Sequence, residues 1–144
     1  MTLQAFSDSD FGCNPSRRSQ TGILIQFYGS PIVWSNREQD IVATSSCEAE
    51  YIAFTQAAQK LRAVQLLLQE LGVELNCPSP INVDNTSAHG TTSRSKHIDL
   101  RFHYIRDMVN RGAFLVRHVP SRDQLADALT KTARRQLGLQ IRQG

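Results

Sequence analysis

The sequence predicts an α/β fold, in which a mixed five-stranded sheet is flanked by helices. Three observations support this prediction. The 144 residues have the length of one domain, which we expect to span 1–144 with a core from about 3 to 138. Three β-branched and aromatic segments with short connections come first, the pattern of antiparallel neighbours. Helical and strand patterns then alternate, which is typical of crossovers between parallel strands.

The first three predicted strands form the antiparallel part of the sheet. We expect them at residues 2–7, 21–28 and 32–36. A stretch rich in Gly, Asn, Pro and Ser separates the first two strands, and a Gly-Ser-Pro turn separates the second from the third. Trp34, the only tryptophan, lies in the third strand, and we expect it in the core.

A long helix over residues 46–71 is the clearest element of the sequence. Ser45 and Glu48 have the spacing of a capping box, and Gly72 follows the expected end. Apolar residues recur at intervals of three and four, as one face of a helix requires. They are Phe54, Ala57, Leu61, Val64, Leu68 and Leu71.

The rest of the chain supplies two further strands, which we expect to pair in parallel. In chain order the pattern predicts a strand at 81–83, a short helix at 85–89, a loop at 90–96, a helix at 98–110 and a strand at 113–119. A second capping box, from Ser121 to Gln124, opens a last helix. We expect that helix to reach Leu137, just before Gly138.

The composition indicates a globular domain with a slightly basic surface. Sixteen Lys and Arg against thirteen Asp and Glu give a net charge of +3. A basic surface around an acidic site suits a polyanionic substrate held against metal ions. The three cysteines are far apart and lack zinc-ligand spacing, which favours free thiols in a reducing compartment. We expect an intracellular protein with no membrane partner, since no signal peptide or membrane-length apolar run is found.

Two carboxylates stand out from the pattern alone. Glu50 continues the apolar stripe four residues before Phe54, whereas Glu48 lies off it, so we expect Glu50 to point toward the sheet. The alternative is a harmless first-turn glutamate that the helix dipole favours. Asp84 ends a short apolar strand, where functional groups collect in open α/β sheets. Its alternative is a turn-forming Asp-Asn pair.

Two other aspartates are less clear when each is judged alone. Asp8 and Asp10 both lie at the end of the first strand, and alternation does not choose between them. Asp127 lies in the second turn of the predicted last helix, where an acidic side chain is common. Carboxylates that cluster about 4 Å apart repel by about 4 kcal/mol at an effective dielectric of 20. Such a group requires cations, and oxygen ligands select Mg²⁺ or Mn²⁺ for phosphodiester cleavage by two metal ions.

Five ordered segments carry a specific resemblance. They are SDSDFGCNPSRRSQTG (7–22), ATSSCEAEYIA (43–53), INVDNTSA (81–88), SRSKHIDLRFHYIRD (93–107) and VPSRDQLADALTK (119–131). Over about residues 3–131 the chain resembles the ribonuclease H domain of a copia-type LTR retrotransposon polyprotein. The resemblance implies a ribonuclease H-like fold. It also implies endonucleolytic hydrolysis of the RNA strand of RNA–DNA hybrids during reverse transcription, with 5′-phosphate and 3′-hydroxyl ends.

The resemblance also implies the site residues. It selects Asp8 rather than Asp10, and adds Glu50, Asp84 and Asp127 as catalytic residues and metal ligands. Two Mg²⁺ ions are implied, with Mn²⁺ as the other candidate. Asp8 would bridge both ions and Asp127 would bind the ion that activates water, while Glu50 and Asp84 would hold the ion near the leaving 3′ oxygen.

One departure from the family pattern concerns an accessory histidine. Relatives carry it in the loop before the last catalytic helix, and that place falls near Arg122 here. His118 is nearby, but we expect it in or beside the strand. The accessory role is therefore expected to be missing or altered.

Substrate contacts are inferred from basic and small polar residues near these segments. The candidates are Ser9, Arg17, Arg18, Ser46, Asn85, Arg94, Lys96 and Arg101. The alternative for each basic residue is an ordinary solvated face. The expected partners are an RNA–DNA hybrid and the reverse transcriptase and integrase parts of a parent polyprotein, in the cytoplasm or a virus-like particle. The alternative function is a binding module for nucleic acid or protein that cuts weakly or not at all.

Overall fold

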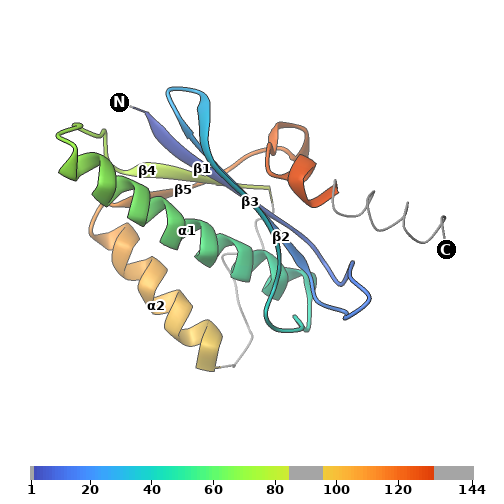
Figure 1. The fold of residues 1–144 in the computed structure, drawn as a ribbon. Coiled ribbons are helices and arrows are strands. Elements are labelled where there is room, and N and C mark those ends of the chain that lie inside the picture. Colours follow the sequence, from blue (N-terminus) through green and yellow to red (C-terminus); the bar gives the residue numbers. More distant parts are fainter. Residues whose placement is uncertain (1, 85–95, 132–144) are drawn as a thin grey trace.

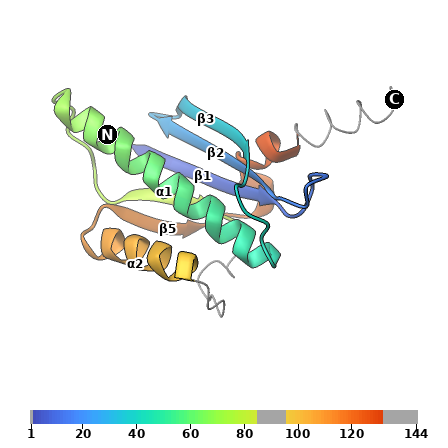
Figure 2. The same ribbon diagram turned by 60° about the horizontal axis from the view of Figure 1, so that its bottom comes forward.

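The computed structural model describes residues 2–84 and 96–131, without the side chains of residues 96–99, 101 and 102. Its five strands form one mixed sheet in the order β3-β2-β1-β4-β5, with α1 and α2 together on one face (Figures 1 and 2). The elements are β1 (Leu3–Asp10), β2 (Gln20–Phe27), β3 (Ser30–Glu38), α1 (Ser46–Glu70), β4 (Ser79–Val83), α2 (Lys96–Asn110) and β5 (Phe114–His118). The predicted fold class is confirmed.

The antiparallel part of the sheet extends further than the sequence pattern suggested. β1 pairs with β2 from Leu3 to Asp10, and β3 reaches Glu38. The prediction for Trp34 is wrong, because its side chain is 66% exposed. Trp34 pairs with Leu24 of β2, whose neighbours on either side point toward the core under α1. Trp34 therefore lies on the opposite face of the sheet, on an edge strand.

The parallel part of the sheet was predicted correctly. β4 pairs in parallel with both β1 and β5. The β1–β4 pairing is short, since it joins only Ala5 to Ile81 and Phe6 to Asn82. The two strands therefore separate before they reach Asp8 and Asp84, and this gap lies at the carboxyl ends of both strands.

The first turn of α1 has the predicted cap. The Ser45 hydroxyl accepts a hydrogen bond from the Glu48 amide at 3.1 Å, and the Glu48 carboxylate accepts one from the Thr44 amide at 2.9 Å. At the other end the helix stops at Glu70, and Gly72 turns the chain with φ +83°. Leu71 is 70% exposed, so the apolar stripe ends before the position predicted for it.

The hydrophobic core lies between the sheet and α1. Each large side chain that is fully buried there contributes about 1.5–3 kcal/mol. The fully buried members include Leu3, Ile23, Ile25, Leu61, Ile81 and Phe114. No helix in the described part of the chain is long and apolar enough to cross a membrane.

The second capping box is not formed. Ser121–Asp123 is a 3-10 helix, Gln124 has an extended backbone, and the last helix begins at residue 127. Asp127 is therefore in the first turn of that helix and not in its second. The Gln124 amide points inward and bonds strand carbonyls, so it is not available to cap a helix. The predictions for residues 85–95, Leu137 and Gly138 lie outside the described residues.

Candidate active site

Three carboxylates meet at the carboxyl ends of β1 and β4, beside the start of α1. Asp8, Glu50 and Asp84 each offer one oxygen, and these oxygens lie within 4.8 Å of one another. Asp8 is only 5% exposed, and the other two are partly buried. The amide of Ser9 donates to Glu50 Oε1 at 3.3 Å, which ties the helix to the strand. Asp10 is not a member of this group.

Regular secondary structure explains why these three carboxylates lie close together. Parallel β1 and β4 bring Asp8 and Asp84 to the same edge of the sheet. The Ser45 cap sets where α1 begins, and Glu50 follows in its second turn. Asp8 lies in a strand, Glu50 lies in a helix and Asp84 directly follows a strand, and all three elements are anchored in the core.

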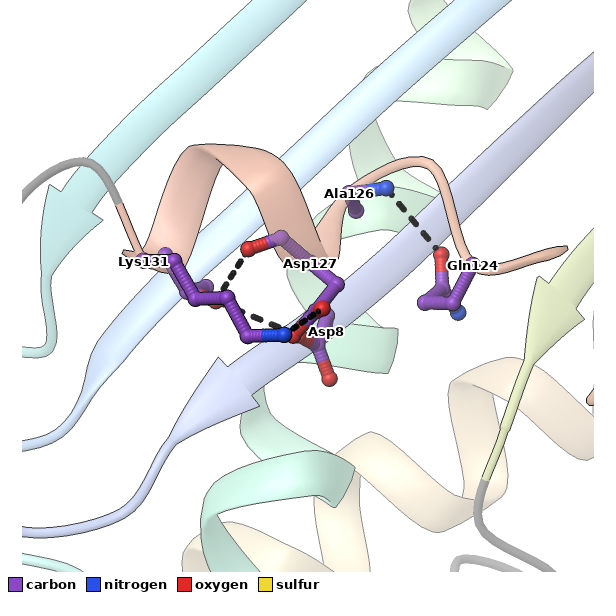
Figure 3. Close-up of polar contacts among 6 residues, drawn as sticks. Asp8, Gln124, Ala126, Asp127 and Lys131 are labelled. Atoms are coloured by element: carbon purple, nitrogen blue, oxygen red, sulfur yellow. Dashed lines mark hydrogen bonds and ion pairs between the residues drawn. The ribbon is translucent and has the colours of Figure 1, made fainter. Parts of the chain in front are cut away.

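Asp127 approaches the group from a different direction, on the short helix that follows the 3-10 turn. It is close enough to Asp8 for its negative charge to raise the pKa of that carboxyl, and the Thr130 hydroxyl lies 3.2 Å from Asp8 Oδ2. The ammonium group of Lys131 is 2.6 Å from Asp127 Oδ2 (Figure 3). The structure thus brings all four predicted carboxylates together, with three in one tight group and Asp127 beside Asp8.

The carboxylates of this site hold protons more tightly than exposed ones. Burial, then the negative charges of Asp84 and Asp127, raise the pKa of Asp8 to about 7. Burial and the charge of Asp8 raise the pKa of Glu50 to about 8. Burial also raises the pKa of Asp84, while the nearby His118 lowers it. Without cations, mutual repulsion in a buried place makes full ionisation unfavourable near neutral pH.

The donor set fits a hard divalent cation. Three carboxylate oxygens within reach of one ion are ligands that Mg²⁺ and Mn²⁺ prefer. A bound cation would replace the repulsion among Asp8, Glu50 and Asp84 by attraction, and would release the protons that their raised pKa values retain. The roles of these residues as metal ligands and catalytic residues stay predictions.

Gln124 supports the site, and the sequence analysis missed its role. Its Nε2 donates to the Ser7 carbonyl at 3.0 Å and to the Asn82 carbonyl at 3.2 Å, and its Oε1 accepts from the Ala126 amide at 3.3 Å (Figure 3). It therefore spans the gap between β1 and β4 just before Asp8 and Asp84. The sequence carried no signal for this role, because a glutamine three residues after a serine also matches a helix cap.

The other predicted site residues are spread around this edge. Ser9 is in β1 with its hydroxyl buried, so that hydroxyl is not exposed to a substrate, and Ser46 is the exposed first residue of α1. Arg17 and Arg18 are exposed in the connection between β1 and β2. Asn85 and Arg94 lie outside the described residues, and the side chains of Lys96 and Arg101 are not described.

The region of the expected accessory histidine holds two basic side chains. His118, at the end of β5, has its Nε2 2.9 Å from the Asp84 carbonyl oxygen. Arg122 lies on the exposed 3-10 helix, with its Nε 3.9 Å from the Asp123 carboxylate. His118 is therefore next to the site although it belongs to the strand.

Known proteins resemble this chain in sequence and in fold. No family model matches it. It is 40% identical over 138 residues to the retrovirus-related Pol polyprotein of transposon RE2 from Arabidopsis thaliana, and 36% identical over 139 residues to that of transposon TNT 1-94 from Nicotiana tabacum. The matches cover 91% and 92% of this chain but 10% of each polyprotein. The chain therefore spans about one tenth of these relatives.

Two solved structures have the same fold at low sequence identity. LC11-RNase H1 in complex with an RNA/DNA hybrid has a TM-score of 0.65 and 16% identity, over 91% of this chain and 95% of that one. The N-terminal RNase H domain of a Mycobacterium tuberculosis protein, solved as a fusion with maltose-binding protein, has a TM-score of 0.59 and 13% identity, over 97% and 98% of the two chains. Together with the polyprotein relatives, they confirm the resemblance expected from the sequence.

Proposed function

We propose that this chain, which belongs to the copia-type retrovirus-related Pol polyproteins and has the ribonuclease H fold, is a metal-dependent endonuclease. Its reaction is hydrolysis of the RNA strand of RNA–DNA hybrids during reverse transcription, with 5′-phosphate products. The observation that carries the proposal is the meeting of Asp8, Glu50 and Asp84 within 4.8 Å, with Asp127 beside them. One buried and two partly buried carboxylates held this close together would lower stability if their role were purely structural.

The four carboxylates divide between two ions in this proposal. Asp8, Glu50 and Asp84 would hold one, and Asp8 with Asp127 would hold the other. When bound, these ions would supply activation of the attacking water and stabilisation of the leaving oxygen. The protein keeps Asp8 buried and oriented through Thr130, and keeps Glu50 oriented through the Ser9 amide.

The substrate proposal rests on charge and on the fold relatives. One of them was solved with an RNA/DNA hybrid. Arg17 and Arg18 are exposed in the loop that leaves the strand of Asp8, where they are placed to bind phosphates. Ser46, exposed at the start of α1, supplies a hydroxyl that can bond 2′-hydroxyls, whereas the Ser9 hydroxyl is buried. The proposed partners are the reverse transcriptase and integrase parts of a polyprotein, in the cytoplasm or a virus-like particle.

Cleavage of an end-labelled RNA–DNA hybrid with Mg²⁺ or Mn²⁺ tests the proposal, with Asp84→Asn compared to the wild type. Asp10→Asn is the matched control, because Asp10 lies on the same strand as Asp8 but outside the group of three. We expect metal-dependent cutting by the wild type and by Asp10→Asn, and a loss of about 10³-fold or more in Asp84→Asn.

Two results would contradict the proposal. One is the absence of cutting with either metal, and the other is equal cutting by Asp84→Asn. If the wild type bound hybrids without turnover, and Asp8→Asn bound them equally well without metal, the chain would be a binding module.

A further inference from the structure

We propose that Gly22 is a positioning residue, whose missing side chain allows the last helix to hold Asp127 beside Asp8. The inference rests on the proposed nuclease function and adds a determinant for the second metal ion. Gly22 lies in β2 and is the direct partner of Asp8 across the β1–β2 pairing. Paired residues point to the same face of a sheet, so Gly22 and Asp8 share the face that the last helix approaches.

The helix lies directly against the backbone at Gly22. A Cβ atom there would be 2.7 Å from the Ala126 carbonyl oxygen, 2.9 Å from the Thr130 methyl carbon and 3.4 Å from the Leu129 Cβ. The first contact is with backbone, so rotation of a flexible side chain does not relieve it. Any side chain at position 22 therefore requires the helix to move away from the sheet.

Backbone conformation does not explain this glycine. Within the described residues, the glycines with positive φ are Gly12, Gly29, Gly72 and Gly112, and position 22 is not among them. Glycine inside a strand weakens it by roughly 0.5–1 kcal/mol relative to alanine, and is typical of places where another backbone comes close. Close approach of the helix is therefore the physical reason for Gly22.

The contacted helix carries the site residues. Thr130, which touches position 22, also places its hydroxyl 3.2 Å from Asp8 Oδ2 and 3.0 Å from the Asp127 carbonyl oxygen. A helix lifted from β2 would separate both Asp127 and Thr130 from Asp8. Asp8, Glu50 and Asp84 are held by other elements and would remain together. A substitution at Gly22 is thus expected to displace Asp127 from Asp8 and to leave the group of three carboxylates in place.

Gly22→Ala is compared with Ile23→Val, its neighbour in β2, whose side chain packs on the opposite face in the core. Displacement of a reacting group by about 1 Å can reduce the rate about 100-fold. We expect Gly22→Ala to cut hybrids roughly 10- to 100-fold more slowly and to require more Mn²⁺ for half-maximal rate. Ile23→Val should lose some thermal stability and keep the wild-type Mn²⁺ dependence.

Calorimetric titration with Mn²⁺ measures the effect of Gly22→Ala on metal binding without a cleavage assay. The wild type should show two binding steps, and Gly22→Ala should keep the tighter step while the weaker one shifts to higher concentration. Two steps in an inactive wild type, with the weaker one shifted by Gly22→Ala, would support this inference and contradict the nuclease function. Wild-type Mn²⁺ behaviour in folded Gly22→Ala would overturn the inference.

A double variant tests whether Gly22 affects cleavage through Asp127. If Gly22 acts through Asp127, Gly22→Ala adds little to the loss already caused by Asp127→Asn. A full additional loss would overturn the inference.

Should Gly22→Ala fail to fold, Thr130→Val preserves the shape and removes the hydroxyl that reaches Asp8. We expect it to shift the Mn²⁺ requirement in the same direction, and wild-type behaviour of Thr130→Val would count against the inference.

Discussion

The two parts of the candidate site are held in different ways. The group of three carboxylates lies on β1, on α1 and directly after β4, and the positions of these elements follow from backbone hydrogen bonds and the core beneath α1. Asp127 lies on residues 121–131, which contact the sheet through the Gln124 and Thr130 side chains and through close packing against the Gly22 backbone. Asp8 is almost fully buried, whereas the Asp127 side chain is 33% exposed.

This difference predicts different sensitivities. Removal of a carboxylate from the group of three should abolish the first metal site and leave the fold intact. Changes in the contacts of residues 121–131 should loosen the second part while the first remains formed. The following predictions test this division, from the largest expected effect to the smallest.

The largest effect is expected for Glu50→Gln. The amide keeps the shape of the side chain and can still accept from Ser9, but it loses the charge that a metal ion requires. Hybrid cleavage should fall by about 10³-fold or more, and Mn²⁺ binding measured by calorimetry should lose its tight step.

Glu48→Gln is the control for this change on the same helix. Gln can still accept from Thr44 but loses the charge that the helix dipole favours, so Glu48→Gln should lower the free energy of unfolding by roughly 0.3–1 kcal/mol and leave Mn²⁺ binding unchanged. Equal losses of cleavage in the two variants would show that helix stability, and not the Glu50 charge, is what matters.

Gln124→Leu should affect both parts of the site. It leaves the buried carbonyls of Ser7 and Asn82 without their donor, and each such loss costs about 1–3 kcal/mol. We expect a lower unfolding midpoint in urea together with slower cleavage of the hybrid.

Gln65→Leu supplies a matched comparison away from the site. Buried Gln65 also donates twice, to the Ser79 hydroxyl and to the Ala113 carbonyl, both at 2.9 Å. A similar loss of stability with normal Mn²⁺ dependence is expected. If Gln124→Leu also retained normal Mn²⁺ dependence, Gln124 would be a structural residue only.

The metal-free protein should lose stability as pH rises. Folding raises the pKa of Asp8 to about 7 and that of Glu50 to about 8, so the folded state binds protons more tightly than the unfolded state. The resulting stabilisation is complete below about pH 4 and is lost as pH rises through these values. Thermal melts in chelator should therefore show a midpoint several degrees lower at pH 9 than at pH 6.

Saturating Mg²⁺ or Mn²⁺ should remove most of this dependence, since bound cations replace the protons. Glu50→Gln should make the slope shallower in chelator, because one of the titrating groups is gone. An unchanged slope in Glu50→Gln would contradict the assignment of the pH effect to this group.

The smallest effect is expected for Lys131→Gln. The Lys131 ammonium group neutralises Asp127 from the position that a second cation would compete for. Its removal should lower the Mn²⁺ concentration for half-maximal cleavage by about two- to five-fold, the scale of a partly exposed ion pair.

Arg111→Gln breaks a pair of the same spacing, with Asp107, on α2. It should leave the Mn²⁺ dependence of cleavage unchanged. A Lys131→Gln variant that needed more Mn²⁺ than the wild type would mean that Lys131 supports the site instead of competing within it.

Local patterns predicted most of the first part of the site. The cap at Ser45 indicated where the helix begins, and the apolar stripe of α1 placed Glu50, not Glu48, on the face toward the sheet, with a harmless first-turn glutamate as the open alternative. Strand ends located Asp84. The choice of Asp8 over Asp10 came only from the family resemblance, because both lie on one strand and alternation treats them alike.

The errors in the prediction share one physical cause. Trp34 is a typical core residue, but the face that β3 presents to solvent depends on where the helices pack. The spacing from Ser121 to Gln124 matches a capping box, but two strand carbonyls distant in sequence use the glutamine amide instead. Competition from distant groups is invisible in a local pattern.

The sequence by itself determined the order of the elements, the start of α1 and the residue types of the site, because these depend on local spacing, capping and alternation. Tertiary structure alone decided how Asp127 reaches Asp8. Gly22, Gln124 and Thr130 each act through a partner far along the chain, so their contacts exist only after the sheet has formed and residues 121–131 lie against it.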